Sequence, residues 1–355
     1  MALKLMKGND ALAEAAVRAG CRFFGGYPIT PQSEILEYLS KRMPEVGGHF
    51  VQSESELAGI SMVHGAAAAG FRTMTSSSGP GFSLLQEGIS YIASAELPAV
   101  IINVQRYGSG LGDIFQAQGD YFQAVKGGGH GDYRMIVYAP ASIQENVDFT
   151  TLAFDKADEY RNPVLVLSDA SIASMMEPVD LPEMHEHDPN KSPHAAKGKG
   201  NGPFKRITST MYYIDDFDTY IKTKYDNMAA NEERWEAVQV ADAELVLVAY
   251  GITSRICKEA VMLAREKGIK LGLIRPITLW PFPAKAFKAL PDTVASFMTV
   301  ELSPMPMIQE DVLLSLDTRK PVHNFLAGMN IPEPIDIVEK AADCIKQTAK
   351  GACNG

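Results

Sequence analysis

The sequence predicts an α/β protein: a doubly wound parallel sheet followed by a smaller α/β domain. From Cys21 to about Leu181, short apolar runs alternate with helical patterns, as expected of parallel strands joined by crossover helices. A second alternating unit begins at Leu245, after a stretch rich in proline, lysine and glycine that breaks the pattern. The 355 residues are enough for two such domains.

Each part of the chain carries its own element signals. In the first domain, residues 1–181, we expect strands near residues 21–24, 49–52, 71–75, 98–104, 135–138 and 163–167. Residues 182–240 lose the alternation and are interpreted as a linker and subunit-contact segment, with a helix around 231–238. In the second domain, residues 241–355, we expect strands at 245–248, 271–274 and 296–301, and a helix capped by Ser254 that runs to Lys267.

The turn after the first strand is the first candidate ligand site. Gly25 and Gly26 end the strand, and Pro31 opens a helix with Thr30 as its expected N-cap. Turns at the carboxyl edge of a parallel sheet often bind ligands. A purely structural turn with a proline start has the same pattern.

Two carboxylates precede a helix of very small side chains. Glu54 and Glu56 are expected in its first turn, where the helix dipole favours a negative charge. The helix continues through residues 57–70 with mostly alanine, glycine and serine, so it can approach its neighbours closely and is expected to be buried. Glu54 is interpreted as a solvated acid.

Three further segments contain candidate site residues. Arg106 follows the apolar run 99–104, where a guanidinium needs either an anion or a structural ion pair. The loop 76–81 has free backbone N–H groups but neither a P-loop ending nor a dinucleotide fingerprint, and is interpreted as a tight turn. In the glycine-rich loop 126–132, His130 is a weak candidate for acid–base chemistry.

Composition excludes several function classes. A net charge of −10 without a basic stripe argues against nucleic acid and anionic membrane partners. The start of the chain lacks the apolar core of a signal peptide, and no run is long enough to span a bilayer, so a cytoplasmic protein is expected. His185, His187 and His194 are expected to be solvated rather than metal ligands.

Cysteine spacing limits the redox chemistry that the chain itself can perform. Its four cysteines form no C-x-x-C pair, which argues against an iron–sulfur cluster held by this chain alone. They are Cys21, Cys257, Cys344 and Cys353.

Several segments together resemble the alpha subunits of 2-oxoacid:ferredoxin oxidoreductases, in particular the 2-ketoisovalerate (3-methyl-2-oxobutanoate) type. The likeness covers nearly the whole length and rests on the order and spacing of these segments. They are 6–9 (MKGN), 27–31 (YPITP), 75–82 (TSSSGPGF), 103–106 (NVQR) and 126–134 (KGGGHGDYR).

The resemblance implies one half of a thiamine diphosphate site in the first domain and a transketolase C-terminal-like second domain. Glu56 aligns with the glutamate that activates the cofactor, whose carboxyl group bonds the pyrimidine N1' and so promotes deprotonation of the thiazolium C2. Thr30 and Arg106 are implied to contact substrate or cofactor, with Arg106 on the substrate carboxylate. The implied cofactor-binding residues are Tyr27, Pro28, Ile29, Glu56, Ser78 and Gly79.

The resemblance also implies partners and an activity. A beta subunit would contribute the diphosphate and magnesium half of the site, so no metal ligand is expected in this chain. Ferredoxin-like gamma and delta subunits would hold iron–sulfur clusters, coenzyme A would accept the acyl group, and ferredoxin would take the electrons. The chain alone is expected to be inactive.

Two alternatives stay open. One is another enzyme of the same cofactor class, above all a 2-oxoglutarate:ferredoxin oxidoreductase subunit, although the absence of a Gly-Asp-Gly motif disfavours a self-contained transketolase. The other is a non-catalytic scaffold. Residues 107–114 depart from the glycine-proline-glycine run of the relatives, so the sequence does not predict which 2-oxoacid is used.

Overall fold

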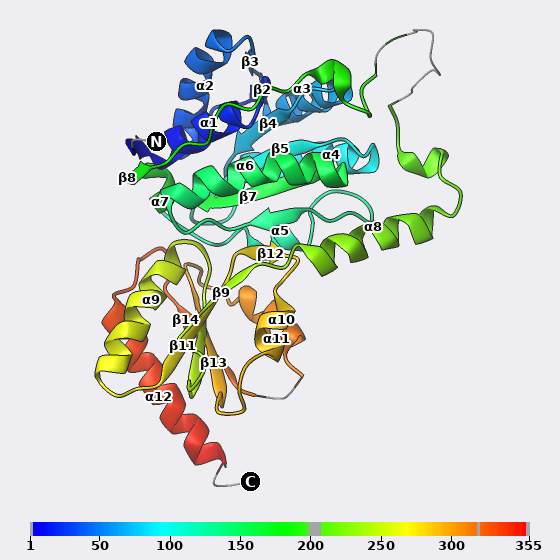
Figure 1. Ribbon diagram of the computed structural model, residues 1–355. Helices are drawn as coiled ribbons and strands as arrows, with labels where there is room; N and C mark the ends of the chain where they lie inside the picture. The colour runs from blue at the N-terminus through cyan, green and yellow to red at the C-terminus, as the bar shows by residue number, and fades with distance from the viewer. Residues whose placement is uncertain (1–2, 197, 199–206, 318–319, 353–355) are drawn as a thin grey trace.

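The computed structural model describes residues 3–196, 198, 207–317 and 320–352. Two main sheets form the centres of an upper and a lower layered unit, and α8 (Phe217–Asn231) runs along one side between them (Figure 1). In the described part of the chain, no helix has the length and apolar character needed to cross a membrane.

The first sheet confirms the predicted doubly wound architecture. Its strands are parallel except for the antiparallel edge strand β12. Each strand predicted in this domain is present with its start displaced by at most two residues. In spatial order the sheet contains β12 (Thr278–Trp280), β6 (Ile136–Tyr138), β7 (Pro163–Asp169), β5 (Ala99–Gln105), β4 (Thr73–Ser77), β2 (Phe23–Gly26) and β3 (His49–Gln52).

Helices cover both faces of this sheet. Along β5, Val100 and Ile102 pack into one cluster while Ile101 packs into the other, because successive side chains of a strand point to opposite faces. The first cluster includes α1 (Gly8–Arg18), α2 (Ser33–Glu45) and α6 (Ile143–Tyr160). The second includes α3 (Glu56–Ala68), α4 (Pro80–Ser94) and α5 (Tyr121–Val125).

The small-residue helix α3 is only partly buried, contrary to expectation. Ile60, Val63 and Ala67 face the core, whereas Leu57 and Gly65 are exposed. A Cβ atom added at Gly65 would meet no atom within 4 Å. The close packing that the small side chains allow is therefore used on one side of the helix only.

The second sheet is mainly parallel and corrects one sequence-based expectation. Residues 231–238 were predicted as a helix, but 235–238 form β9, which pairs antiparallel with β11. Here tertiary pairing overrides local propensity. The sheet contains β14 (Val322–Leu326), β13 (Ser296–Glu301), β10 (Leu245–Val248), β11 (Leu271–Pro276) and β9 (Trp235–Val238).

Helices also cover the second sheet. Ser254 was expected to cap a helix, but α9 begins at Gly251, after Tyr250 as N-cap, and the Ser254 hydroxyl donates to the Gly251 carbonyl. The remaining helices of this unit are α9 (Gly251–Glu266), α10 (Ala284–Lys288), α11 (Ile308–Ser315) and α12 (Pro334–Ala352).

The segment between the two sheets packs back onto the first unit. It begins after α7 (Ala170–Ser174) and β8 (Met176–Val179), which pairs with β1 (Lys4–Lys7). Two short turns, η1 (Pro189–Lys191) and η2 (Thr210–Tyr212), lie in it.

Two histidines of this segment differ from expectation. His194 was predicted to be solvated but is buried, and burial lowers its pKa below the ordinary value. His187 is half-buried, with its Nε2 2.8 Å from the Gly70 carbonyl oxygen, and only His185 of the three is exposed.

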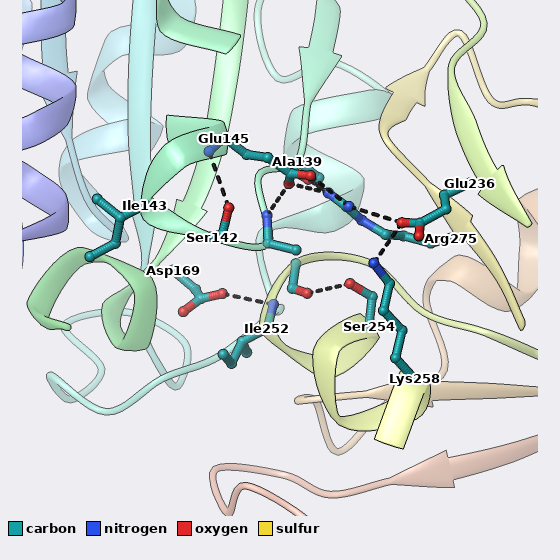
Figure 2. A network of polar contacts seen from close by, with 12 residues as sticks. Ala139, Ser142, Ile143, Glu145, Asp169, Glu236, Ile252, Ser254, Lys258 and Arg275 are labelled. Atoms are coloured by element: carbon teal, nitrogen blue, oxygen red, sulfur yellow. Dashed lines mark hydrogen bonds and ion pairs between the residues drawn. The ribbon is translucent and has the colours of Figure 1, made fainter. Parts of the chain in front are cut away.

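A buried arginine connects the two units. Arg275 on β11 is 2% exposed and pairs with Glu145 on α6 and with Glu236 on β9. Figure 2 shows this guanidinium between the two carboxylates. Nearby, Asp169 at the end of β7 accepts from the Ile252 backbone N–H of α9 at 3.3 Å. The sequence-based division of the chain at residues 181 and 240 stays a prediction. β9 lies in the segment 182–240 but pairs with β11 of the second sheet, and β12 lies in the segment 241–355 but pairs with β6 of the first sheet.

Candidate active site

Four neighbouring strands end at the same edge of the first sheet and supply the predicted site residues. β3, β2, β4 and β5 are adjacent and parallel, so their carboxyl ends lie together. The segments that follow them contain the turn after Gly26, the acid Glu56, the loop at Ser78 and the cation Arg106.

Glu56 is the buried acid of this edge. It is the first residue of α3, where Ser55 caps the helix by accepting from the Ala58 N–H at 3.2 Å. Glu56 is 5% exposed, whereas Glu54 lies outside the helix and is exposed. The Ser77 hydroxyl, 3.5 Å from Glu56 Oε1, is its one hydrogen-bonding side-chain partner among the described residues. A buried carboxylate at a helix start is thus left with most of its hydrogen-bonding capacity available.

Two glycines let the start of α4 approach both charged groups. A Cβ atom at Gly81 would lie 2.2 Å from Glu56 Oε1, and one at Gly79 would lie 3.0 Å from Arg106 Nε. Gly79 also has a φ of +49°, which favours glycine. The helix begins at Pro80, so the last two residues of the segment 76–81, interpreted from the sequence as a tight turn, are already helical. This turn therefore separates Glu56 from Arg106 and contacts both.

Arg106 follows the central strand β5, as predicted, and is 7% exposed. Its Nη1 donates to the Thr30 carbonyl at 2.8 Å and its Nη2 to the Leu111 carbonyl at 2.5 Å. Its buried Nε has no hydrogen-bond partner among the described residues. Within that same part of the chain no carboxylate oxygen lies within 4.0 Å of the guanidinium, so a structural ion pair does not account for its burial.

The turn 27–31 is stabilised by a hydrogen bond from Gln32, a residue that the sequence analysis did not identify. Gln32 is fully buried, donates to the Tyr27 carbonyl at 3.1 Å and accepts from the Ser76 hydroxyl at 2.6 Å. Gln32, and not the expected Thr30, is the N-cap residue of α2, and it makes no side-chain cap bond. A polar side chain directly after Pro31 was the available signal.

The other predicted residues lie around these groups. Tyr27, Pro28 and Thr30 are exposed and Ile29 is half-buried, so the turn presents its side chains outward. Ser78 is fully buried, and its hydroxyl has no partner among the described residues.

A second acid, the half-buried Asp120, was also missed. Asp120 accepts from Asn103 on β5 at 2.9 Å. Burial raises the pKa of Asp120, while the hydrogen bond from Asn103 and the charge of Arg106 act in the opposite direction. Nothing in the sequence around Asp120 distinguishes it from a loop acid.

His130 lies apart from this constellation. It is exposed and lines a surface pocket of about 580 Å³ together with residues of α4 and α8, including Tyr91 and Phe217. In the described ranges no group of three or more His, Cys, Asp or Glu side chains could hold a metal ion. Cys21, Cys257 and Cys344 are buried free thiols; Cys353 is outside the described residues.

These residues fit the pyrimidine side of thiamine diphosphate. The requirement is a buried carboxyl group with a free oxygen for the pyrimidine N1', and Glu56 with its single weak partner meets it. The buried, unpartnered hydroxyl of Ser78 and the missing side chains of Gly79 and Gly81 leave polar capacity and space beside it. No cluster suited to the metal of the diphosphate is found in the described chain.

Comparison with known families assigns both parts of the chain. Residues 14–243 match the family described as "Pyruvate flavodoxin/ferredoxin oxidoreductase, thiamine diP-bdg". Residues 243–334 match "Pyruvate:ferredoxin oxidoreductase core domain II".

Two curated relatives are similar over most of their length. The ketoisovalerate oxidoreductase subunit VorB of Methanothermobacter thermautotrophicus is 50% identical, with 96% of this chain and 97% of the relative covered. The 2-oxoglutarate synthase subunit KorA of Methanocaldococcus jannaschii is 39% identical, with 82% and 86% covered.

Solved structures agree with this assignment. A 2-oxoglutarate:ferredoxin oxidoreductase from Magnetococcus marinus, with 2-oxoglutarate, coenzyme A and succinyl-CoA bound, matches with a TM-score of 0.84 and 26% identity. The match covers 97% of this chain and 65% of that one. A split-gene transketolase shares the fold at a TM-score of 0.62 and 15% identity. The expected fold and resemblance are thus confirmed, and the chain belongs to the 2-oxoacid:ferredoxin oxidoreductase family as an alpha-type subunit with a thiamine diphosphate-binding domain.

Proposed function

We propose that this chain is the alpha subunit of a complex that oxidatively decarboxylates a branched-chain 2-oxoacid to acyl-CoA and passes the electrons to ferredoxin. The single observation that carries the proposal is the buried Glu56, with most of its hydrogen-bonding capacity available, at the carboxyl edge of a thiamine diphosphate-binding domain. The 50% identity to a ketoisovalerate oxidoreductase subunit supports the substrate class.

Each residue has a proposed task. Thiamine diphosphate supplies, when bound, the carbon nucleophile that the decarboxylation of a 2-oxoacid needs. Glu56 holds a proton at its carboxyl oxygen and shares it with the pyrimidine N1'. Arg106 binds the carboxylate of the 2-oxoacid through its guanidinium, as a planar fork suited to a carboxylate. Thr30 contacts substrate or cofactor through its hydroxyl, and Tyr27, Pro28, Ile29, Ser78 and Gly79 line the pyrimidine.

A second subunit completes the site in this proposal. The exposed side of α3 and α4 carries Leu57, Met62, Leu84 and Tyr91, and Gly65 leaves room for a close approach. Several exposed large apolar side chains on two adjoining helices are typical of a protein interface. We assign this face to a beta subunit that brings the diphosphate and magnesium half of the site. Gamma and delta subunits with iron–sulfur clusters would carry the electrons to ferredoxin, in a cytoplasmic complex.

The second candidate is a 2-oxoglutarate oxidoreductase subunit, favoured by the 39% identity to a KorA protein. The two candidates differ in the substrate side chain, which is apolar in one case and carries a second carboxylate in the other. A substrate panel therefore separates them.

The test is coenzyme A-dependent viologen reduction by the chain assembled with its partner subunits. We expect turnover with 2-ketoisovalerate to exceed that with pyruvate and 2-oxoglutarate. Preference for 2-oxoglutarate would select the second candidate. No turnover with any 2-oxoacid by a thiamine diphosphate-loaded complex would refute both and return the scaffold interpretation.

A further inference from the structure

We propose that Leu111 is a specificity-determining residue, which contacts the side chain of the 2-oxoacid while Arg106 holds its carboxylate. This inference rests on the function proposed above and deepens it. The contact that carries it is the hydrogen bond from Arg106 Nη2 to the Leu111 carbonyl oxygen, 2.5 Å long.

The loop 107–115 is a closed structure that fixes where Leu111 lies. The Tyr107 N–H donates to the Phe115 carbonyl at 2.9 Å, and the Asp113 N–H donates to the Tyr107 carbonyl at 2.7 Å. A Cβ atom at Gly112, which has a φ of +63°, would lie 2.3 Å from the Tyr107 carbonyl oxygen. The loop therefore returns tightly on itself directly after Arg106.

The loop is also anchored beyond its end. The Gln116 side chain donates to the Met329 carbonyl at 2.7 Å, and the Gln118 side chain donates to the Tyr250 carbonyl at 2.8 Å. Both acceptors belong to the second unit. Because both ends are fixed, the position of the Leu111 backbone at the guanidinium is set by the fold.

Arg106 is available for an anion in this arrangement. In the described part of the chain its Nη atoms donate to two neutral carbonyl groups, and its Nε has no hydrogen-bond partner. A substrate carboxylate makes shorter and stronger bonds to a guanidinium than a carbonyl does. Binding at Arg106 would thus bring the carboxylate next to Leu111.

The side chain at this position is apolar and unusually exposed. Leu111 is 79% exposed, and its backbone carbonyl binds the buried guanidinium of Arg106. In a 2-oxoacid only the keto carbon separates the carboxylate from the first side-chain carbon, so a residue that touches the carboxylate's arginine lies near that side chain. An apolar contact there favours a branched aliphatic group and disfavours a second carboxylate.

The experiment compares Leu111→Ala with the matched variant Ile114→Ala in the assembled complex. Ile114 is in the same loop and also exposed, but its backbone N–H binds the Asp113 side chain and not Arg106. The readout is kcat/KM for 2-ketoisovalerate and for pyruvate in coenzyme A-dependent viologen reduction. Direct binding of both 2-oxoacids to the cofactor-free complex, measured by calorimetry, is the second readout.

In Leu111→Ala we expect the ratio of kcat/KM for 2-ketoisovalerate over pyruvate to fall about tenfold, the lower end of what a lost apolar contact costs. Ile114→Ala should keep the ratio within about twofold. If the wild-type complex is active and Leu111→Ala keeps this ratio, or lowers kcat/KM for both 2-oxoacids equally, the inference about Leu111 is overturned. The proposed function is then unaffected. An inactive wild-type complex would instead refute the proposed function.

Discussion

Gly81 should be indispensable because its missing side chain leaves the space that the Glu56 carboxyl group occupies. An added Cβ atom would lie 2.2 Å from Glu56 Oε1 and equally close to Ser77 Oγ. The backbone at Gly81 has no positive φ, so alanine itself is not strained there. The clash falls on the far ends of two side chains, which can move. Gly81→Ala is therefore expected to fold and to displace Glu56.

The size of the effect follows from the displacement. Restoring ordinary contact at 3.4 Å requires the carboxylate oxygen to retreat by about 1.2 Å, and a misplacement of about 1 Å can cost a factor of about 100 in rate. That factor corresponds to about 2.7 kcal/mol of activation free energy. The free energy of unfolding should change by only about 1 kcal/mol, since no core contact is lost.

The assay is coenzyme A-dependent viologen reduction by the complex assembled with Gly81→Ala. Gly119→Ala is the control, since a Cβ atom there meets nothing within 4 Å. Denaturant unfolding of both variants checks the fold. Turnover of Gly81→Ala within about fivefold of wild type would refute the reasoning, because the predicted factor is about 100.

Two predictions concern stability. Burial raises the pKa of Asp169 from 3.8 to about 6, so between these pH values the folded state binds more protons than the unfolded state, and stability falls as pH rises from about 4 to 6, by up to about 3 kcal/mol. In Asp169→Asn, urea unfolding should show a flatter pH profile in this window; an unchanged slope would contradict the assignment. Glu145→Gln leaves the buried Arg275 with one carboxylate, Glu236 at 3.4 Å, and should lower the free energy of unfolding by about 3 kcal/mol. Glu236→Gln, at the longer and more exposed pair, should cost less, and equal costs in urea unfolding would argue against this ranking.

The parallel strands of the first sheet were predictable because a buried strand leaves a local apolar run. The run 99–104 became β5, and 245–248 and 296–301 became β10 and β13 without change. The short edge strand β12 could not be predicted, since its assignment to the first sheet depends on pairing with β6, far away in sequence.

The wrong helix at 231–238 has the same origin. The local composition of residues 231–238 suits a helix, whereas β9 forms because it pairs with the edge of β11. The true helix, α8, lies just before it.

The charged residues of the candidate site could be predicted from the sequence, but the residues that hydrogen-bond around them could not. Glu56 and Arg106 stand out because charged residues border apolar segments, and both are buried. Gln32 and Asp120 act through contacts with Ser76 and Asn103, which only the fold brings near. The roles assigned to the site residues stay predictions.

The most direct test of the account is the turnover of Glu56→Gln in the assembled complex, with Glu54→Gln as the matched control. Glu54 lies two residues away and is exposed, so its variant should retain wild-type turnover. Loss of a group that holds a catalytic proton costs a factor of about 100 or more, and we expect that loss in Glu56→Gln. Normal turnover of Glu56→Gln in a thiamine diphosphate-loaded complex would contradict the central claim.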